Sequence, residues 1–300
     1  MTLRPGGPAA TAVEAVVVGV VGAALGGAVW GLLHPVLGVV MAAVAGVNGV
    51  ICGWRQVYPW QRWSGLVAFV LDSTWATVPV AGGLLAHLVA ARSRASRYEP
   101  SLSRRHGQHV YRGGLHFKKG FALTVGNVIS GAGDVSRPRR RKLITDHEAV
   151  HVWQARWFGP CYLPLYGLWA GVGVLGGVLV WLRRGRKEPL GTMIESCSYY
   201  TNPFEWWAYS RDDLWPPPGK RHGVGWRSAA VRPLATLPRR AARVSGVDPT
   251  GHGGHAADRA DGADRAADVA LRGPLRAGHR RGIGHRRGHV PAVRRRGGHG

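Results

Sequence analysis

The sequence predicts a mainly α-helical membrane protein that carries a small α+β domain and ends in a disordered basic tail. Three long apolar stretches fill the first third of the chain, at about residues 12–33, 35–54 and 64–91. A helix that spans a bilayer needs about 20 apolar residues, and each stretch supplies them. Residues 92–215 mix strand-like and helical patterns, whereas residues 216–300 are dominated by Arg, Gly, Ala and His.

The three N-terminal stretches are predicted to be transmembrane helices. His34-Pro35 separates the first two, and because Pro disfavours helix in the residue before it, we expect a tight turn there. The third stretch contains Asp72 and Pro79. An acidic side chain at bilayer depth is costly and marks a functional site, unless it lies near the interface, where the cost falls. Both interpretations of Asp72 stay open.

Basic residues predict the orientation of these helices. Five arginines follow the third stretch: Arg92, Arg94, Arg97, Arg104 and Arg105. The positive-inside rule places them in the cytoplasm, which predicts a multi-pass membrane protein with its following domain on the cytoplasmic face. Three spans would then place the N-terminus outside together with Arg55 and Arg62, in conflict with the same rule.

The net charge and the cysteines exclude several classes of protein. Cys52, Cys161 and Cys197 lie far apart and form no C-x-x-C pair, which excludes a disulfide framework and a thiolate zinc site. The net charge of +24 is typical of nucleic-acid binding, but much of it lies in residues 216–300. That segment cannot bury enough apolar surface to fold alone, and contact with nucleic acid is expected only through this tail, which could also bind anionic lipid.

The middle of the chain predicts short strands followed by a helix. Gly113-Gly114 lies between two strand-like segments and suggests a hairpin, and Phe121–Ser130 is predicted to form one strand. From Leu143 the apolar residues recur at helical spacing until Gly159-Pro160 ends the pattern. We therefore expect one helix between Leu143 and Gly159-Pro160.

This helix carries the H-E-x-x-H motif formed by His147, Glu148 and His151. Residues i and i+4 share a helix face, so both histidines can direct a ring nitrogen at one Zn²⁺ ion, with Glu148 placed to take a proton from water. The alternative is a pair of surface histidines beside a solvated Glu.

A third protein ligand is expected downstream, at Glu205. Asn202 and Pro203 suit the N-cap and first position of a new helix, which places Glu205 in its first turn. In the alternative, Asn202 and Glu205 form a capping box and the Glu bonds its own backbone. Asp212, two turns on, is a candidate for supporting a ligating histidine. The candidates for stabilising an oxyanion, chosen by residue type, are Tyr199, Tyr200, Tyr209, His109 and His116.

The segments DHEAVHVWQARWFGPCYLPLYGLW and YYTNPFEWWAY resemble the gluzincin branch of zinc metallopeptidases, and in particular small bacterial zincin-like proteins. The resemblance covers about residues 140–213. It implies a zincin-like domain in which His147, His151 and Glu205 bind zinc and Glu148 is the general base. Gln154 belongs to the same motif and Asn202 opens the second one, so both are candidates for supporting contacts to the ligands.

The expected activity is zinc-dependent hydrolysis of peptide bonds in a peptide or membrane-protein substrate, held along the strand at 121–130. Two alternatives belong to other classes. One is a non-catalytic membrane scaffold with a structural or degenerate zinc site. The other is a membrane-tethered binder of nucleic acid or anionic lipid that acts through the basic tail.

A further apolar segment, residues 161–182, lies between the histidines and Glu205 and is long enough to span a bilayer. One clean span would separate Glu205 from the histidines. Three alternatives resolve this conflict. The segment could bend back near Gly171 or Gly176-Gly177, or it could pack against the protein at the membrane surface. In the third alternative, Glu205 is not a ligand. Because basic residues flank both ends, we predict that the segment does not cross.

Overall fold

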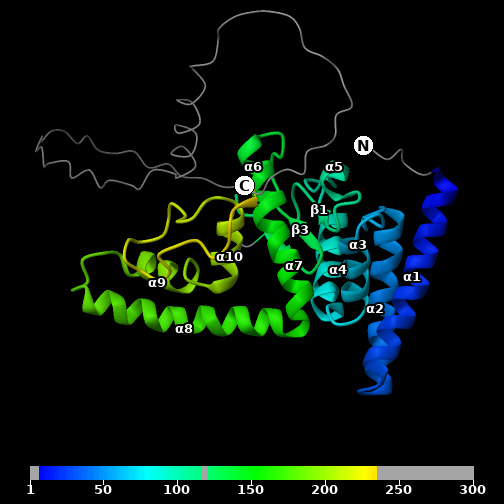
Figure 1. Ribbon diagram of the computed structural model, residues 1–300, viewed down its shortest axis with the longest axis horizontal. Coiled ribbons are helices and arrows are strands. Elements are labelled where there is room, and N and C mark those ends of the chain that lie inside the picture. Colours follow the sequence, from blue (N-terminus) through cyan, green and yellow to red (C-terminus); the bar gives the residue numbers. More distant parts are fainter. Residues whose placement is uncertain (1–6, 117–119, 235–300) are drawn as a thin grey trace, which may run out of the picture. The chain divides into compact units, whose positions relative to one another are not determined.

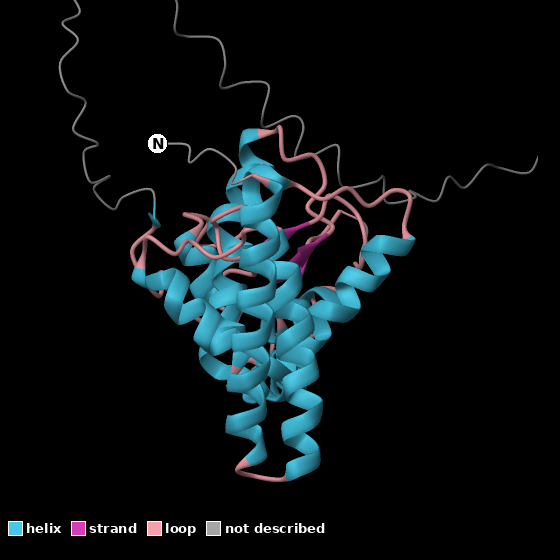
Figure 2. Ribbon diagram, turned by 90° about the vertical axis from the view of Figure 1, so that its right-hand side faces the viewer, coloured by secondary structure: helices cyan, strands magenta, loops and turns pink. Residues whose placement is uncertain are grey.

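The computed structural model describes residues 7–116 and 120–234 of the chain, and the predicted disorder of residues 235–300 lies outside them. The described residues are mainly helical and include one small sheet, as predicted. The first two helices, α1 (Pro8–Gly31) and α2 (Pro35–Trp54), form an antiparallel hairpin whose turn projects at the lower end of Figure 2. Glycines allow the two backbones to touch, since a Cβ on Gly49 would lie 2.5 Å from the Val18 carbonyl oxygen.

The third apolar stretch differs from the prediction of one straight span. It forms two helices, α3 (Trp63–Ser73) and α4 (Thr77–Arg92), which meet at an angle of 89°. Thr74 leaves the helical conformation, with φ −124° and ψ −92°. Pro79 follows in the first turn of α4, where its missing N–H breaks no helical hydrogen bond. The bend therefore lies between α3 and α4, where Pro79 is compatible with the first turn of a new helix.

This bend changes the expected topology. Glu14 in α1 forms an ion pair of 2.6 Å with Arg105. Arg105 also donates a hydrogen bond to the carbonyl oxygen of Tyr58, a residue that follows α2. The start of α1, the end of α2 and the segment after α4 therefore lie at one end of the hairpin. The predicted arrangement, with the N-terminus on the opposite side from Arg105, is wrong.

Within residues 7–116 and 120–234, three helical stretches are long and apolar enough to cross a membrane, namely Pro8–Gly31, Pro35–Trp54 and the longer run Pro138–Arg183. Their exposed surfaces are strongly apolar: Leu32 is 88% exposed and Val39 is 72% exposed. These features support membrane association.

The sheet has three short strands in the order β1-β3-β2: β1 (His109–Val110), β2 (Leu123–Val125) and β3 (Val128–Ser130). The predicted single strand at 121–130 is therefore a hairpin, because Gly126 adopts a positive φ of 57° and turns the chain. The predicted hairpin at Gly113-Gly114 does not form, since β1 pairs in parallel with β3. A four-residue helix, α5 (Pro100–Ser103), precedes β1.

The predicted helix of the H-E-x-x-H motif is confirmed. It begins with α6 (Pro138–Lys142), continues through one π-helical stretch, η1 (Leu143–Glu148), and ends as α7 (Ala149–Phe158). A short 3₁₀ turn, η2 (Gly159–Cys161), follows, and Gly159 has a positive φ of 51°. A Cβ on Gly159 would lie 2.5 Å from the ring of Trp75, so only glycine suits this corner.

The segment at 161–182 forms one uninterrupted helix, α8 (Tyr162–Arg183), so the alternative of a bend at Gly171 or Gly176-Gly177 does not hold. The chain returns instead through α9 (Leu190–Ser198), which packs antiparallel on α8, and then enters α10 (Pro203–Arg211). In Figure 1, α8 runs transverse to α1, α2 and α7.

The first part of the predicted tail is not separate from the domain. Within residues 216–234, Val224 packs with Met193 and Cys197, and the Trp226 ring stacks on Trp206 with centroids 4.1 Å apart. The boundary expected at residue 216 therefore moves toward the C-terminus, because these two apolar side chains find partners on α9 and α10.

A buried ion pair fastens the motif helix to α3. Arg156 in α7 donates to both carboxylate oxygens of Asp72, at 2.8 and 2.9 Å, and the two side chains are only 2% and 1% exposed. Tyr58 donates a further hydrogen bond of 3.0 Å to Asp72. Asp72 therefore has a structural partner for its charge, which accounts for an acidic residue inside an apolar stretch.

We expect Asp72→Asn to destabilise the protein by on the order of 3–5 kcal/mol, because Arg156 would keep a buried charge without a counter-charge. Urea unfolding in detergent micelles measures the loss. The exposed Asp213→Asn is the matched control and should change little. Replacing both partners, as Asp72→Leu with Arg156→Met, should recover most of the lost stability. An Asp72→Asn variant as stable as the control would contradict this role.

Candidate metal centre

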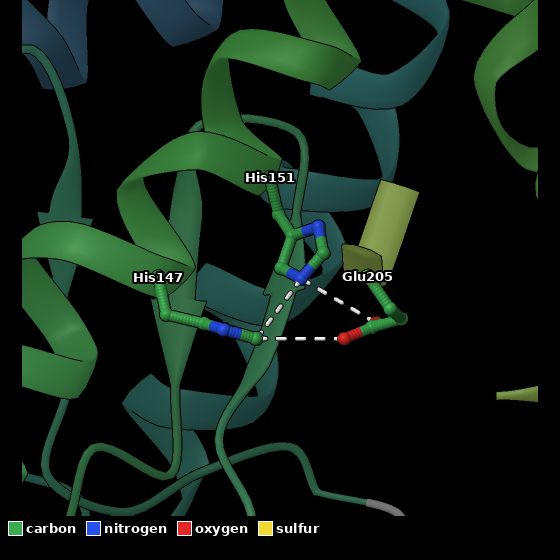
Figure 3. Close-up of side chains that lie close together, drawn as sticks. All are labelled: His147, His151 and Glu205. Carbon is green, nitrogen blue, oxygen red and sulfur yellow. Dashed lines mark hydrogen bonds and ion pairs between the residues drawn. The ribbon is translucent and has the colours of Figure 1, made fainter. Parts of the chain in front are cut away.

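Three side chains from two distant segments meet in the interior of the protein (Figure 3). His147 comes from η1, His151 from α7 and Glu205 from the first turn of α10. They are 3%, 6% and 4% exposed, respectively. The alternative of two solvated surface histidines therefore does not hold, since both rings lie in the core.

The distances between the donor atoms match one tetrahedral ion. The two Nε2 atoms lie 3.3 Å apart, Glu205 Oε2 lies 3.5 Å from His147 Nε2, and the other carboxylate oxygen, Oε1, lies 3.4 Å from His151 Nε2. In a tetrahedral zinc site each ligand atom lies about 2.0–2.1 Å from the metal ion. Two ligand atoms of such a site are therefore roughly 3.3–3.4 Å apart. The residues present therefore fit a zinc ion in the chemistry of their donors as well as in their spacing.

Two polar groups orient His151. Its Nδ1 atom lies 2.8 Å from Gln154 Oε1 and 3.2 Å from the Tyr162 hydroxyl, which leaves Nε2 facing Glu205. The Gln154 amide also donates to the Phe204 carbonyl oxygen at 3.0 Å and so joins α7 to α10. Gln154 therefore contacts both His151 and the backbone of α10.

Asn202 and Glu205 have separate roles at the start of α10. The Asn202 side chain accepts a hydrogen bond from the Phe204 N–H at 3.1 Å and caps the helix. The Glu205 carboxylate faces the histidines and accepts from the Tyr166 hydroxyl at 2.9 Å, and no bond from it to the Asn202 backbone occurs in the described structure. Asn202 therefore acts through the helix cap.

The histidines keep Glu205 ionised. Burial by itself raises the pKa of this carboxyl group, but the charges and hydrogen bonds of His151 and His147 outweigh burial and lower the pKa well below its usual value. An ionised carboxylate is the form that binds a metal ion.

The tyrosines predicted as oxyanion stabilisers gather beside the site. The Tyr209 ring packs on His147 with centroids 4.4 Å apart, and its hydroxyl lies 3.3 Å from that of Tyr199. The Tyr200 ring lies 6.0 Å from Tyr209. Burial first, and then the charge of Glu205, raise the pKa of Tyr209 and of Tyr199, so both hydroxyls stay protonated and able to donate.

Other predicted candidates lie elsewhere. His109 is fully buried beside Cys52, at 3.3 Å, and His116 is exposed and bonds the Gly114 carbonyl oxygen. Asp212 does not support a ligating histidine, because both of its carboxylate oxygens accept from Arg139 in α6, at 2.8 and 2.7 Å. This pair ties the end of α10 to the helix that precedes the motif.

Glu148 accepts a hydrogen bond from the neighbouring strand, β2. Glu148 is 6% exposed, and its Oε2 atom accepts a hydrogen bond of 2.7 Å from Thr124 in β2. Its charge also contributes to the raised pKa of Tyr209. The general-base candidate is therefore fixed in orientation close to the three candidate ligands.

The sequence analysis missed Tyr162 and Tyr166. Both stand near the start of α8, one helical turn apart, and their hydroxyls contact His151 and Glu205. The available signal was their i, i+4 spacing, which places two polar groups on one face of an otherwise apolar helix.

Comparison of the chain with models of protein families, with curated proteins and with solved structures finds no match. The function must therefore be inferred from the site itself.

Proposed function

We propose that the protein is a membrane-associated, zinc-dependent peptidase of the gluzincin type. The observation that carries this proposal is the clustering of His147, His151 and Glu205, which can each offer one ligand atom within 4.8 Å of the others. Glu148 supplies a carboxylate beside them, held by Thr124. Two imidazoles with one carboxylate form the ligand set of a hydrolytic zinc site.

The number of ligands favours a catalytic role over a structural one. Structural zinc sites are closed by four protein ligands, whereas catalytic sites use three and leave one position for water or substrate. The group assembled from the described residues has three members. This count supports an enzyme rather than a scaffold.

The proposed reaction is hydrolysis of an amide bond. When bound to the three ligands, Zn²⁺ would supply a Lewis acid that lowers the pKa of water and polarises a carbonyl group. Glu148 accepts a proton from the attacking water while the oxygen atom of the water forms a bond to the carbonyl carbon. Glu148 then passes this proton to the amide nitrogen as the C–N bond breaks, which yields a carboxylic acid and an amine.

Hydroxyl donors can stabilise the negative charge that develops on the carbonyl oxygen. Tyr209 is the favoured candidate, because its ring packs on His147 and its raised pKa keeps its proton in place. Tyr199 is placed to orient it through the contact between their hydroxyls.

The edge of the sheet offers a place for an extended substrate. Among the described residues β2 pairs only with β3, so its other edge has no partner strand. Thr124 at the centre of β2 contacts Glu148 directly. A peptide that adds to this edge would lie beside the general base, with backbone hydrogen bonds giving affinity. Because β3 is internal, only β2 of the predicted strand 121–130 can serve in this way.

The placement in the membrane follows from charge and exposure. We propose that α1 and α2 cross the bilayer and that their common charged end, with Arg55, Arg62 and Arg105, lies in the cytoplasm. The conflict with the positive-inside rule disappears, since only two helices cross. The candidate metal centre then lies on the cytoplasmic side of a bacterial inner membrane.

We propose that α8 lies along the membrane surface and does not cross it. Its outward face is wholly apolar, with Leu168, Leu175 and Leu179 exposed by 67%, 68% and 55%. Its opposite face packs on α9, whose Glu195 is exposed. One side of α8 thus suits lipid and the other side carries protein that faces water.

We expect the purified full-length protein to contain one zinc ion per chain, and His147→Ala or Glu205→Ala to contain almost none, because each variant removes one ligand. Metal analysis by mass spectrometry gives the ratio, and circular dichroism checks folding. The exposed His116→Ala and Glu195→Ala are matched controls that should keep the metal. Full zinc content in both ligand variants would end the assignment.

We expect Glu148→Gln to lower peptide hydrolysis by about 10²–10⁴-fold while zinc remains bound, because only the general base is lost. Release of fluorescence from an internally quenched peptide library measures the rate, with Glu195→Gln as the control. A zinc-loaded wild-type protein that cleaves nothing, or a Glu148→Gln variant as active as the wild type, would favour the non-catalytic scaffold.

We expect cysteines introduced before and after α8, as Arg141→Cys and Arg227→Cys in a Cys161→Ser background, to react with a membrane-impermeant maleimide from the same side of sealed vesicles. Both positions are exposed. A cysteine at Leu32, in the turn between α1 and α2, should react only from the other side. Labelling of Arg141→Cys and Arg227→Cys from opposite sides would show that α8 crosses the bilayer.

A further inference from the structure

A continuous apolar groove runs along α2, away from the candidate metal centre. It consists of two hollows of about 500 and 750 Å³ that share Val47, Val50 and Ile51. The first hollow extends to Ala42 on α2 and Ala23 on α1. The second lies between α2 and α4 and is lined by apolar side chains that include Leu84 and Leu88.

The length of the groove matches one leaflet of a bilayer. From Ala42 to Arg55 the groove follows α2 for thirteen residues, which is about 20 Å at the rise of an α-helix. One leaflet is about 20 Å thick when its headgroup region is included, which is half of the roughly 40–45 Å of a whole bilayer. An acyl chain can therefore lie along the groove with its head at the Arg55 end.

The Arg55 end of the groove is polar and positively charged. The guanidinium of Arg55 lies 4.1 Å from the centre of the Tyr98 ring and donates to the Tyr111 hydroxyl. Within the described structure no carboxylate pairs with Arg55, which is half-buried. The exposed Arg94 and the half-buried Ser96 line the same hollow. A half-buried cation without a counter-ion favours an anionic ligand.

Two buried polar atoms at this end also lack partners. His87, which is 8% exposed, lines the hollow and bonds Tyr111 through Nδ1, but its Nε2 atom has no hydrogen-bond partner among the described residues. The same holds for the Ser96 hydroxyl. Buried polar groups without partners are rare in native structures and call for a ligand or water.

We propose that this groove binds one anionic phospholipid, with its phosphate at Arg55 and Arg94 and one acyl chain along α2. The apolar walls distinguish this ligand from a soluble phosphate, which would have nothing to place between Val50 and Leu88. The site does not depend on zinc or on catalysis, because it uses none of the candidate ligands.

The test uses purified full-length protein in detergent micelles and phosphatidylglycerol with brominated acyl chains, which quench nearby tryptophan. Trp54 lines the hollow and is 60% exposed, so it reports the bound chain. We expect saturable quenching at a concentration several-fold lower than with brominated phosphatidylcholine. Arg55→Gln and Arg94→Gln should each raise the half-saturating concentration by on the order of tenfold, the effect of losing one charged hydrogen bond.

Three controls separate a specific site from general attraction to lipid. Arg92→Gln removes an equally exposed charge that does not line the groove and should leave the titration unchanged. Trp54→Phe should abolish the saturable quenching, and excess glycerol 3-phosphate should not compete. Equal quenching by both lipids, an equal effect of Arg92→Gln and Arg55→Gln, or competition by glycerol 3-phosphate would overturn the proposal.

Discussion

The packing of α9 on α8 is the contact on which the candidate site depends. The 22 residues of α8 carry the chain away from His151, and Glu205 returns only because α9 runs back along the same helix. The two backbones touch at Gly173 and Gly177, where an added Cβ would lie 2.3 Å from the Cys197 carbonyl oxygen and 2.8 Å from the Ile194 Cα atom. Any side chain at these positions would push α9 away and displace α10 with it.

Buried polar contacts then fix the two halves of the site against each other. On one side of α7, Arg156 is held by Asp72 of α3; on the other, Gln154 bonds the backbone of α10. The Arg139 pair with Asp212 adds a third tie at the far end of α10. Because unpairing any of these groups would leave a buried polar atom without a partner, the contacts specify one arrangement of the helices and organise the donor atoms in advance of a ligand.

Local chemistry was sufficient to predict the parts of the site, but not the path between them. The helical spacing after Leu143 and the capping chemistry of Asn202 depend on neighbouring residues, and both helices form as predicted. Glycine was the main source of error. Gly126 turns a chain that was expected to run straight, whereas Gly173 and Gly177 permit close packing rather than a bend. The sequence alone does not distinguish a glycine that turns the chain from a glycine that allows close packing, because the outcome depends on the segment that packs against it.

The position of α8 has a consequence for the kind of substrate that the proposed enzyme would meet. Tyr162 and Tyr166 contact His151 and Glu205 from one face of α8, while Leu168 and Leu175 are exposed on the opposite face. With α8 in the membrane surface, about one helix diameter, roughly 10 Å, would separate the lipid from the candidate metal centre. A chain segment that leaves the bilayer beside α8 would reach Glu148 sooner than a freely diffusing peptide would, because its local concentration is set by its attachment to the membrane. If α8 lies in the membrane surface as proposed, the proposed enzyme would therefore cleave membrane-protein substrates in preference to soluble ones.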